Sequence, residues 1–205
     1  MTDVWLVRHT ETDWNAESRY QGRSDRPLTP AGEKQAAAVS ALFRGAPIAV
    51  VTTTGLARTD VLAQAIAGQA GGAKTRADAR WREIDHGTWE GLTYAEALAR
   101  FGPSVAARND APWSWDGHGG ETLATVFERV RAAWDDICGA PEGGGRVVVS
   151  HATPIQLILC HLLDVPPTRY WQIRIDLGGI THLKLFPSGA IAQFVNRAAP
   201  AHVEE

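Results

Sequence analysis

The stretch Val4-Trp5-Leu6-Val7-Arg8-His9 begins as a short apolar run and ends at two cationic side chains. A continuous run of apolar and β-branched residues predicts a strand that is buried on both faces, as in a parallel sheet. The pattern returns downstream, where residues 146–150 predict another strand and His151 follows directly. Open α/β sheets bind ligands beyond the carboxyl ends of their strands. Two strands that each end in a histidine therefore predict one shared site.

Strands and helices alternate along the chain outward from this first strand. A β-branched run at residues 48–53 predicts a further strand. Helices are expected between and after the strands, at residues 33–43, 56–67, 122–138 and 154–163. The first of these helices has Thr29 as its cap and Pro30 in its first turn. This order predicts an α/β fold of three layers, with a central, mostly parallel sheet between layers of helices.

The C-terminal part of the chain has a different pattern. It predicts three strands, at residues 172–176, 181–186 and 190–196, joined by turns that contain glycine. These strands are expected to form an antiparallel edge on the sheet. No linker or repeat interrupts the 205 residues, and a chain of this length is within reach of one large α/β unit. Residues 1–205 are therefore predicted to be a single catalytic domain.

Bulk composition excludes several classes of function. A net charge of −3 provides no basic field for nucleic acid. No apolar stretch approaches the roughly 20 residues of a membrane span, and the apolar run before Arg8 is too short for a signal peptide. The two cysteines, Cys138 and Cys160, have no Cys-x-x-Cys spacing, which suits a reducing compartment. We expect a cytoplasmic protein without a membrane or nucleic-acid partner.

The residues around His9 form a recognisable motif. The stretch Arg8-His9-Thr10-Glu11-Thr12-Asp13-Trp14-Asn15 resembles the Arg-His-Gly-Glu-Thr-x-Trp-Asn signature of the histidine phosphatase superfamily, in its phosphoglycerate mutase-like branch. Further matches follow in the family's order, at residues 20–22, 27–29, 56–58, 83–91, 119–122 and 150–151. Several short motifs in one order are far more specific than any one of them. The resemblance implies an α/β fold and phosphoryl transfer through a phosphohistidine.

Five side chains are the candidate catalytic group. A phosphate monoester carries close to two negative charges, so its site needs fixed cations and donors, which Arg8 and Arg58 can supply. The resemblance makes His9 the nucleophile, and the neighbouring cations should lower its pKa and keep it neutral. His151 would donate to the phosphoryl oxygens. Glu83 would protonate the leaving oxygen and later activate water, with Asp85 and Glu90 as rivals.

Four further residues are candidates for substrate binding. Asn15 is expected to bond a phosphoryl oxygen, although it could instead hold its turn. Gln21 and Gly22 line the substrate mouth in the family. Ala152 stands at an expected helix start after His151, where a free backbone amide could face an anion.

The chain departs from the family at Thr10, where glycine usually follows the nucleophile. If that position requires a positive φ, a β-branched residue there would be strained. Ala152 and Thr153 also replace glycines that commonly follow the second histidine. These changes bear on how the ligand approaches, and the histidines keep their expected roles.

Trp113 and Trp115 lie in an irregular segment that could act as a lid or simply pack onto the body. No histidines have the spacing of a metal site, so neither a metal nor a cofactor is expected. The sequence predicts a phosphomonoester hydrolase that acts on a small phosphorylated metabolite, with a homodimer as the default assembly. The alternatives are a phosphoglycerate mutase, disfavoured because family mutases carry a longer insertion between Glu83 and His151, and a phosphate-binding protein with weakened catalysis.

Overall fold

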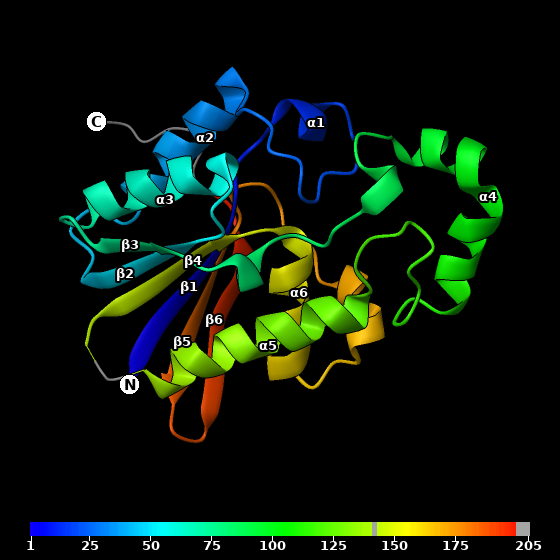
Figure 1. Cartoon of the computed structure of the whole chain (residues 1–205). Helices are drawn as coiled ribbons and strands as arrows, with labels where there is room; N and C mark the ends of the chain where they lie inside the picture. The colour runs from blue at the N-terminus through cyan, green and yellow to red at the C-terminus, as the bar shows by residue number, and fades with distance from the viewer. Residues whose placement is uncertain (141–142, 200–205) are drawn as a thin grey trace.

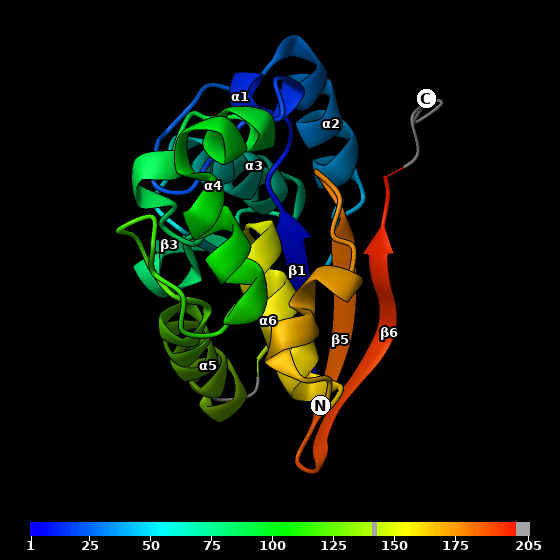
Figure 2. The same ribbon diagram turned by 90° about the vertical axis from the view of Figure 1, so that its right-hand side faces the viewer.

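The structure is a computed structural model that describes residues 1–140 and 143–199, built on a six-stranded mixed sheet. The strands lie in the order β3-β2-β4-β1-β5-β6. Their bounds are β1 Thr2–Arg8, β2 Ile48–Thr53, β3 Lys74–Ala77, β4 Gly145–Ser150, β5 Ile180–Phe186 and β6 Gly189–Arg197. Strands β1 to β4 pair in parallel, whereas β5 and β6 are antiparallel. The predicted α/β class, with its mostly parallel sheet and antiparallel C-terminal edge, is confirmed (Figures 1 and 2).

Helices cover both faces of this sheet (Figure 1). The helices on one face are α2 Pro30–Ala41 and α3 Ala57–Gln69, and those on the other face are α5 Leu123–Gly139 and α6 Ala152–Leu162. Thr29 caps α2 through its hydroxyl, which accepts from Gly32 N, and Pro30 opens the first turn as expected. Connecting segments contain the short helix α1 Asp13–Ala16 and the 3-10 turns η1 Ala79–Trp81, η2 Gly87–Trp89 and η3 Pro167–Gln172.

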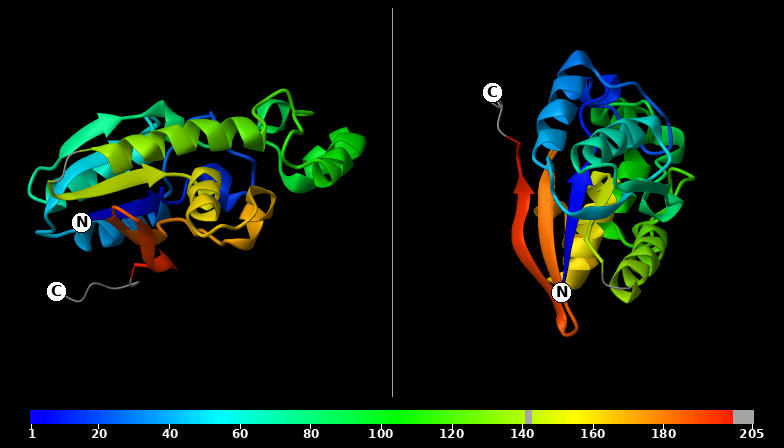
Figure 3. Two further views of the ribbon diagram at one scale, coloured as in Figure 1. Left: turned by 90° about the horizontal axis from the view of Figure 1, so that it is seen from below. Right: turned by 90° about the vertical axis from the view of Figure 1, so that its left-hand side faces the viewer.

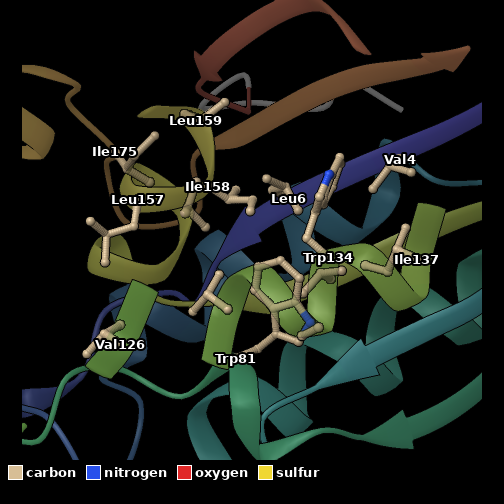
Figure 4. Close-up of a cluster of buried hydrophobic side chains, with 14 of the residues drawn as sticks. Val4, Leu6, Trp81, Val126, Trp134, Ile137, Leu157, Ile158, Leu159 and Ile175 are labelled. Atoms are coloured by element: carbon tan, nitrogen blue, oxygen red, sulfur yellow. The ribbon is translucent and has the colours of Figure 1, made fainter. Parts of the chain in front are cut away.

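Strand β1 is buried on both faces, and its side chains alternate between the two cores. Val4 and Leu6 pack against α5 and α6, where Trp134 covers them (Figure 4). Val7 packs in the opposite core with residues of α2 and α3, such as Val39. Each such buried side chain stabilises the fold by about 1.5–3 kcal/mol. The strand is thereby fixed from both sides, and so is the position of the residues at its carboxyl end.

Helix α4, Tyr94–Asp110, lies beyond the carboxyl ends of the strands, apart from the two helix layers (Figures 1 and 3). A capping box formed by Thr93 and Glu96 begins it. A small core around Trp89, Ala97 and Val105 holds it to the body. This helix is not among those expected from the sequence pattern.

Trp113 and Trp115 both pack onto aromatic neighbours. The ring of Trp113 lies 5.6 Å from that of Phe127, edge to face. Trp115 lies 4.9 Å from Trp89 and 4.6 Å from His118, measured between ring centroids. In this structure the two tryptophans pack onto the body, which is the simpler of the two expectations.

The strand predicted at residues 172–176 is wrong. The 3-10 turn η3 ends at Gln172, and an irregular segment follows it. Side chains take up its backbone groups, since Gln156 Nε2 donates to Ile173 O at 2.7 Å and Arg8 Nη1 donates to Ile175 O at 2.8 Å. Both edges of β5 are already paired, with β1 and β6, so no place in the sheet remains beside it. The segment instead places the carbonyl oxygen of Ile175 beside the carboxyl end of β1.

Two smaller features also bear on the sequence predictions. In the part of the chain that the structure describes, no helix is both long and apolar enough to cross a lipid bilayer. Cys160 is buried, as expected of a small apolar core residue, whereas Cys138 is exposed near the end of α5.

Candidate active site

His9 and His151 lie side by side because their strands are paired. Arg8 is in register with Ser150, and the amide of His9 donates to Ser150 O at 2.9 Å. The next residue on each strand is the histidine. Their ring centroids are 5.1 Å apart and the rings meet edge to face. The structure thus brings the two histidines together at the carboxyl edge of the sheet, where the sequence predicts a shared site.

The hydrogen bonding of His9 determines which of its nitrogens can attack. Its Nδ1 lies 2.8 Å from Thr10 O. A backbone carbonyl oxygen can only accept, so Nδ1 carries the hydrogen in the neutral ring. The lone pair then belongs to Nε2. The backbone therefore fixes the tautomer that a nucleophilic histidine needs.

Both histidines are held neutral by their surroundings. Burial lowers the pKa of His9 well below 6.5, and the positive charges of Arg58 and Arg8 lower it further. The pKa of His151 is lowered in the same way, first by burial and then by Arg58 and His9. The neighbouring positive charges alone predict that the pKa of His9 is lowered, but burial is the larger cause of the shift.

Arg8 and Arg58 are anchored to carbonyl oxygens. Arg8 Nη1 donates to Ile175 O at 2.8 Å, and the two terminal nitrogens of Arg58 donate to Ser24 O at 2.9 Å and Gly22 O at 2.7 Å. These bonds orient the guanidinium planes. Burial lowers the pKa of both groups, and the negative charge of Glu83 raises it again.

Three buried donors at this site have no partner among the described residues. They are Arg8 Nε, Arg58 Nε and Thr10 Oγ1. A buried N–H or O–H without an acceptor costs about 1–3 kcal/mol, so such groups call for an explanation. Two of them belong to the arginines beside His9, and an anion bound there would give these donors an acceptor.

Glu83 lies in the loop between η1 and η2, with its carboxylate turned toward the start of α6. Its Oε1 accepts from Ile84 N at 2.8 Å, and its Oε2 accepts from Thr153 N at 3.4 Å. The side chain is buried. The two rival carboxylates bind other backbone amides. Asp85 Oδ1 accepts from Gly87 N, and the two oxygens of Glu90 accept from Arg23 N and Ser24 N.

Arg129 on α5 holds the Glu83 loop in place, and sequence reasoning missed it. Its guanidinium donates to Arg80 O at 2.7 Å, to Arg82 O at 2.6 Å and to Glu83 O at 3.0 Å. Glu121 pairs with it at 2.8 Å. The Gly-Gly-Glu-Thr motif at residues 119–122 was the available signal, since its glutamate is the partner that orients this arginine.

Three of the expected substrate-binding residues make contacts within and between the loops that carry them. Asn15 Oδ1 accepts from Thr12 N at 3.1 Å in the capping box of α1. Its contact with a phosphoryl oxygen stays a prediction for its amide nitrogen. Gln21 Oε1 accepts from the Thr12 hydroxyl at 2.7 Å. A side chain at Gly22 would collide with Ile84 O, because its Cβ would lie 2.2 Å away.

Thr10 adopts an ordinary backbone conformation. It is absent from the non-glycine residues with positive φ, which among the described residues are Ser18, Asp164 and Asn196. The strain that a β-branched residue would suffer at a left-handed position therefore does not arise. Ala152 is the first residue of α6, directly after His151 at the N-cap.

The site is suited to an anion rather than to a metal. Within residues 1–140 and 143–199, no group of three His, Cys, Asp or Glu side chains lies close enough together to hold a metal ion. The arrangement brings two guanidiniums, two neutral imidazoles and a carboxylate to one edge of the sheet. Such a set can bind a phosphoryl group and offers both a nucleophile and an acid.

The buried neutral histidines predict a loss of stability in mild acid. Burial, with the charge of Arg108, lowers the pKa of His86 to about 3 from 6.5, and His9 and His151 are lowered as well. Below 6.5 the unfolded chain binds protons that the folded chain does not, so unfolding becomes easier as pH falls. Each such histidine costs up to about 1.4 kcal/mol per pH unit. Urea denaturation should therefore give a lower free energy of unfolding at pH 5.5 than at pH 7.

The window between pH 5 and 6.5 separates this effect from that of the carboxylates. Glu121 has a lowered pKa, but its contribution is lost only below its unfolded value of 4.5. A His86→Asn variant should lose about one histidine's share of the pH dependence, and replacement of the exposed His161 by asparagine is the matched control. A flat profile from pH 5 to 7 in the unsubstituted protein contradicts the prediction.

Comparison with known proteins identifies the family. The histidine phosphatase superfamily (branch 1) matches residues 4–198. Phosphoserine phosphatase 1 of Hydrogenobacter thermophilus is 32% identical over 176 residues, covering 86% of this chain and 83% of that protein. A probable phosphoglycerate mutase GpmB of Salmonella choleraesuis is 36% identical over 182 residues, covering 85% and 81%. The structure of a mycobacterial glucosyl-3-phosphoglycerate phosphatase complexed with VO3 is similar, with a TM-score of 0.83, 27% identity and coverage of 97% and 100%. The chain therefore belongs to branch 1 of the histidine phosphatase superfamily and is an enzyme of that family.

Proposed function

We propose that this enzyme hydrolyses the phosphomonoester of a small metabolite through a phosphohistidine intermediate. One observation carries the proposal: the neutral His9, with its Nε2 lone pair available, lies beside two arginines whose buried Nε groups have no partner among the described residues. A phosphoryl dianion would satisfy both arginines and place its phosphorus beside the nucleophile.

In the first step, His9 Nε2 attacks phosphorus and the bond from phosphorus to the leaving oxygen breaks. Arg8 and Arg58 offset the charge on the phosphoryl oxygens as they pass through the transition state. Glu83 gives its proton to the leaving oxygen, so the product departs as an alcohol. His9 keeps the phosphoryl group, and its Nδ1–H remains bonded to Thr10 O.

In the second step, water attacks the phosphohistidine. Glu83, now ionised, takes a proton from this water, and the bond between phosphorus and Nε2 breaks. Inorganic phosphate forms, and both Glu83 and His9 return to their starting states. The Thr153 amide faces Glu83 Oε2 at 3.4 Å and holds the carboxyl group in place for both steps.

A phosphoglycerate mutase remains the alternative. It would use the same phosphohistidine and return the phosphoryl group to another hydroxyl of the product. The relative named a probable mutase aligns over 81% of its own length, so a shorter chain does not by itself exclude this activity. The length of this chain is therefore a weaker argument against a mutase than the resemblance to the family suggests.

A rapid-quench experiment distinguishes a phosphatase from a mutase and from a binding protein. A phosphatase should release nitrophenol from nitrophenyl phosphate in a burst of one equivalent per site, followed by steady turnover with release of inorganic phosphate. A mutase should interconvert 2- and 3-phosphoglycerate faster than it releases phosphate. A protein that binds inorganic phosphate but gives neither signal is a binding protein.

Arg108 supports a more specific expectation about the substrate. Its guanidinium stacks over Trp89, with 5.8 Å from its central carbon to the ring, and donates to Tyr170 Oη at 3.1 Å. None of the described carboxylates lies within ion-pairing distance of it. A cavity of about 370 Å³ opens beside it, lined also by Pro112, Thr168 and Trp171. An uncompensated cation next to a cavity favours an anionic ligand group.

Arg108 is also connected to the phosphate site. The ring of His86 lies 4.9 Å from Tyr20, and the charge of Arg108 lowers the pKa of His86. The backbone of His86 borders Gly22, whose carbonyl oxygen accepts from Arg58. We therefore propose that the substrate carries a carboxylate or other anion besides its phosphate. The names of two relatives, a phosphoserine phosphatase and a glucosyl-3-phosphoglycerate phosphatase, support this chemistry.

Replacing Arg108 by glutamine should raise KM selectively. For phosphate esters that carry a carboxylate we expect an increase of about tenfold or more, the effect of losing one charge-assisted hydrogen bond. For esters without a second anion, KM should change less than about twofold on the same grounds. Arg100→Gln, an exposed arginine on the same helix, is the matched control. An equal change for both classes of ester contradicts the assignment.

A further inference from the structure

A series of threonine hydroxyls leads away from His151 toward a carboxylate. Thr54 Oγ1 lies 3.2 Å from His151 Nε2. Thr59 Oγ1 lies 2.9 Å from Thr54 Oγ1 and 2.8 Å from Thr53 Oγ1. Thr53 Oγ1 in turn makes a short hydrogen bond to Asp60 Oδ1. An unbroken series of polar atoms thus connects the buried ring of His151 to the carboxylate of Asp60 on α3.

The direction of these hydrogen bonds follows from their two ends. Arg58 Nη2 lies 3.4 Å from His151 Nδ1 and can only donate, so Nδ1 bears the lone pair and Nε2 bears the hydrogen. His151 Nε2–H therefore donates to Thr54, and Thr54 donates to Thr59. At the far end, an ionised Asp60 can only accept, so Thr53 donates to it.

The orientation of the Thr59 hydroxyl decides whether the series of hydrogen bonds is continuous. Its hydroxyl has two acceptors at the same distance of 2.8 Å, the backbone oxygen of Leu56 and Thr53 Oγ1. A bond to Leu56 O is the usual local contact of a threonine in the first turn of a helix. Rotation of this one hydroxyl toward Thr53 aligns every donor from His151 to Asp60.

The burial of the chain makes this connection effective. Thr54 and Thr59 are fully buried, and Thr53 is 7% exposed. Hydrogen bonds in series polarise one another in such surroundings. Asp60 is half-buried and borders a surface cavity of about 200 Å³ that Arg76 also lines. The carboxylate end is thus open to solvent, whereas the histidine end is closed.

We infer that Asp60 acts on His151 through the hydroxyls of Thr53, Thr59 and Thr54, fixing the Nε2–H tautomer and stabilising the ring when it carries a second proton. The inference rests on the proposed phosphatase reaction for its catalytic meaning. When a phosphate dianion binds, His151 takes a proton from solvent at Nδ1, gives up the contact between Nδ1 and Arg58 Nη2, and donates an Nδ1–H hydrogen bond to a phosphoryl oxygen while the ring keeps the proton. The bond from Nε2–H to Thr54 is kept throughout. Asp60 and the threonines are positioning residues, since none of them touches the substrate.

The charges around His151 explain why such support is needed. Arg8 on β1, His9 directly after it, Arg58 on α3 and Arg129 on α5 all disfavour a cationic ring. Glu83 is the carboxylate whose negative charge acts most strongly on Arg8 and Arg58. The hydroxyl chain brings the influence of a second carboxylate to the ring without placing a negative charge where a phosphate must bind.

The test compares substitutions that break the chain with ones that preserve it. Thr59→Val removes the central hydroxyl at constant shape, Thr59→Ser keeps it, and Asp60→Asn removes only the charge. We expect kcat to fall about tenfold in Thr59→Val and Asp60→Asn, comparable to one charge-assisted hydrogen bond, with KM nearly unchanged. The basic limb of the kcat–pH profile should move to lower pH, because the cationic ring is less stable. Thr59→Ser should retain the profile of the unsubstituted enzyme, and Asp135→Asn, on the surface of α5, is the carboxylate control.

A second measurement does not depend on turnover. Nitrogen-15 NMR of the histidine rings, with and without inorganic phosphate, should show His151 in its Nε2–H form and then doubly protonated, and Asp60→Asn should weaken the second state. Asp60→Asn and Thr59→Val that fold and keep the original kcat, pH profile and nitrogen shifts would overturn the inference. If Thr59→Val does not fold, Asp60→Asn decides alone. An unsubstituted enzyme without hydrolytic activity overturns the proposed function, and the NMR comparison then still decides on the hydroxyl chain.

Discussion

Replacement of His9 by alanine is expected to abolish turnover while leaving the fold and the phosphate site intact. Without Nε2 no covalent intermediate can form, so kcat should fall by about 10⁴-fold or more, and the nitrophenol burst should disappear. Arg8, Arg58 and His151 keep their own anchors in the variant, because each is bonded to groups other than His9. Inorganic phosphate should therefore still bind, within about tenfold of the original Kd.

The binding measurement makes this prediction specific to catalysis. Calorimetric titration with phosphate reports the anion site, and rapid-quench kinetics report the phosphohistidine. His161→Ala is the matched control, an exposed histidine on α6 outside the site. A His9→Ala enzyme that keeps a burst, or one-tenth of the original kcat, shows that another residue is the nucleophile. Loss of phosphate binding together with activity points instead to a collapsed site.

The parts of the fold that could be predicted from the sequence are those whose burial requires a recognisable pattern of apolar residues. Strands β1, β2 and β4 are continuous apolar runs because both of their faces are covered, and their ends place His9 and His151. Strand β3 was not predicted because all of its residues are exposed, so its sequence has no apolar pattern typical of a strand. The wrong strand at residues 172–176 failed for the opposite reason. Ile175 is buried and Ile173 is partly buried, but the side chains of Arg8 and Gln156 bind their carbonyl oxygens.

The residues of the candidate site also differ in whether they could be identified from the sequence. Residues that follow a strand directly, such as Arg8 and His9, are placed by the sheet and could be identified from their motif. Arg129 could not, because its function depends on three carbonyl oxygens of a loop that is about 46 to 49 residues away along the chain. Thr54 and Thr59 look like ordinary residues of a strand end and a helix start. Only their distances to His151 and to each other reveal the hydroxyl chain.

Replacement of Glu83 by glutamine is expected to give an effect that depends on the leaving group. An alkyl leaving group needs a proton, so the loss of the general acid should lower kcat/KM for a phosphorylated alcohol by about 10²–10⁴-fold. Nitrophenol leaves readily as an anion, so its burst should be nearly as fast as in the unsubstituted enzyme. The second step lacks its base for both substrates. The variant should therefore show a full burst followed by slow turnover, with phosphohistidine accumulating on the enzyme.

The two rival carboxylates supply the controls. Asp85 and Glu90 accept from backbone amides of the surrounding loops, so Asp85→Asn and Glu90→Gln should alter stability or KM without any dependence on the leaving group. Their melting temperatures, measured beside that of Glu83→Gln, separate loosened loops from lost proton transfer. If Glu83→Gln slows both classes of substrate equally in the first step, then Glu83 is not the acid. If Asp85→Asn reproduces the selective loss on alkyl phosphates, the acid is Asp85, and the amide of Thr153 at Glu83 Oε2 serves the architecture of α6 alone.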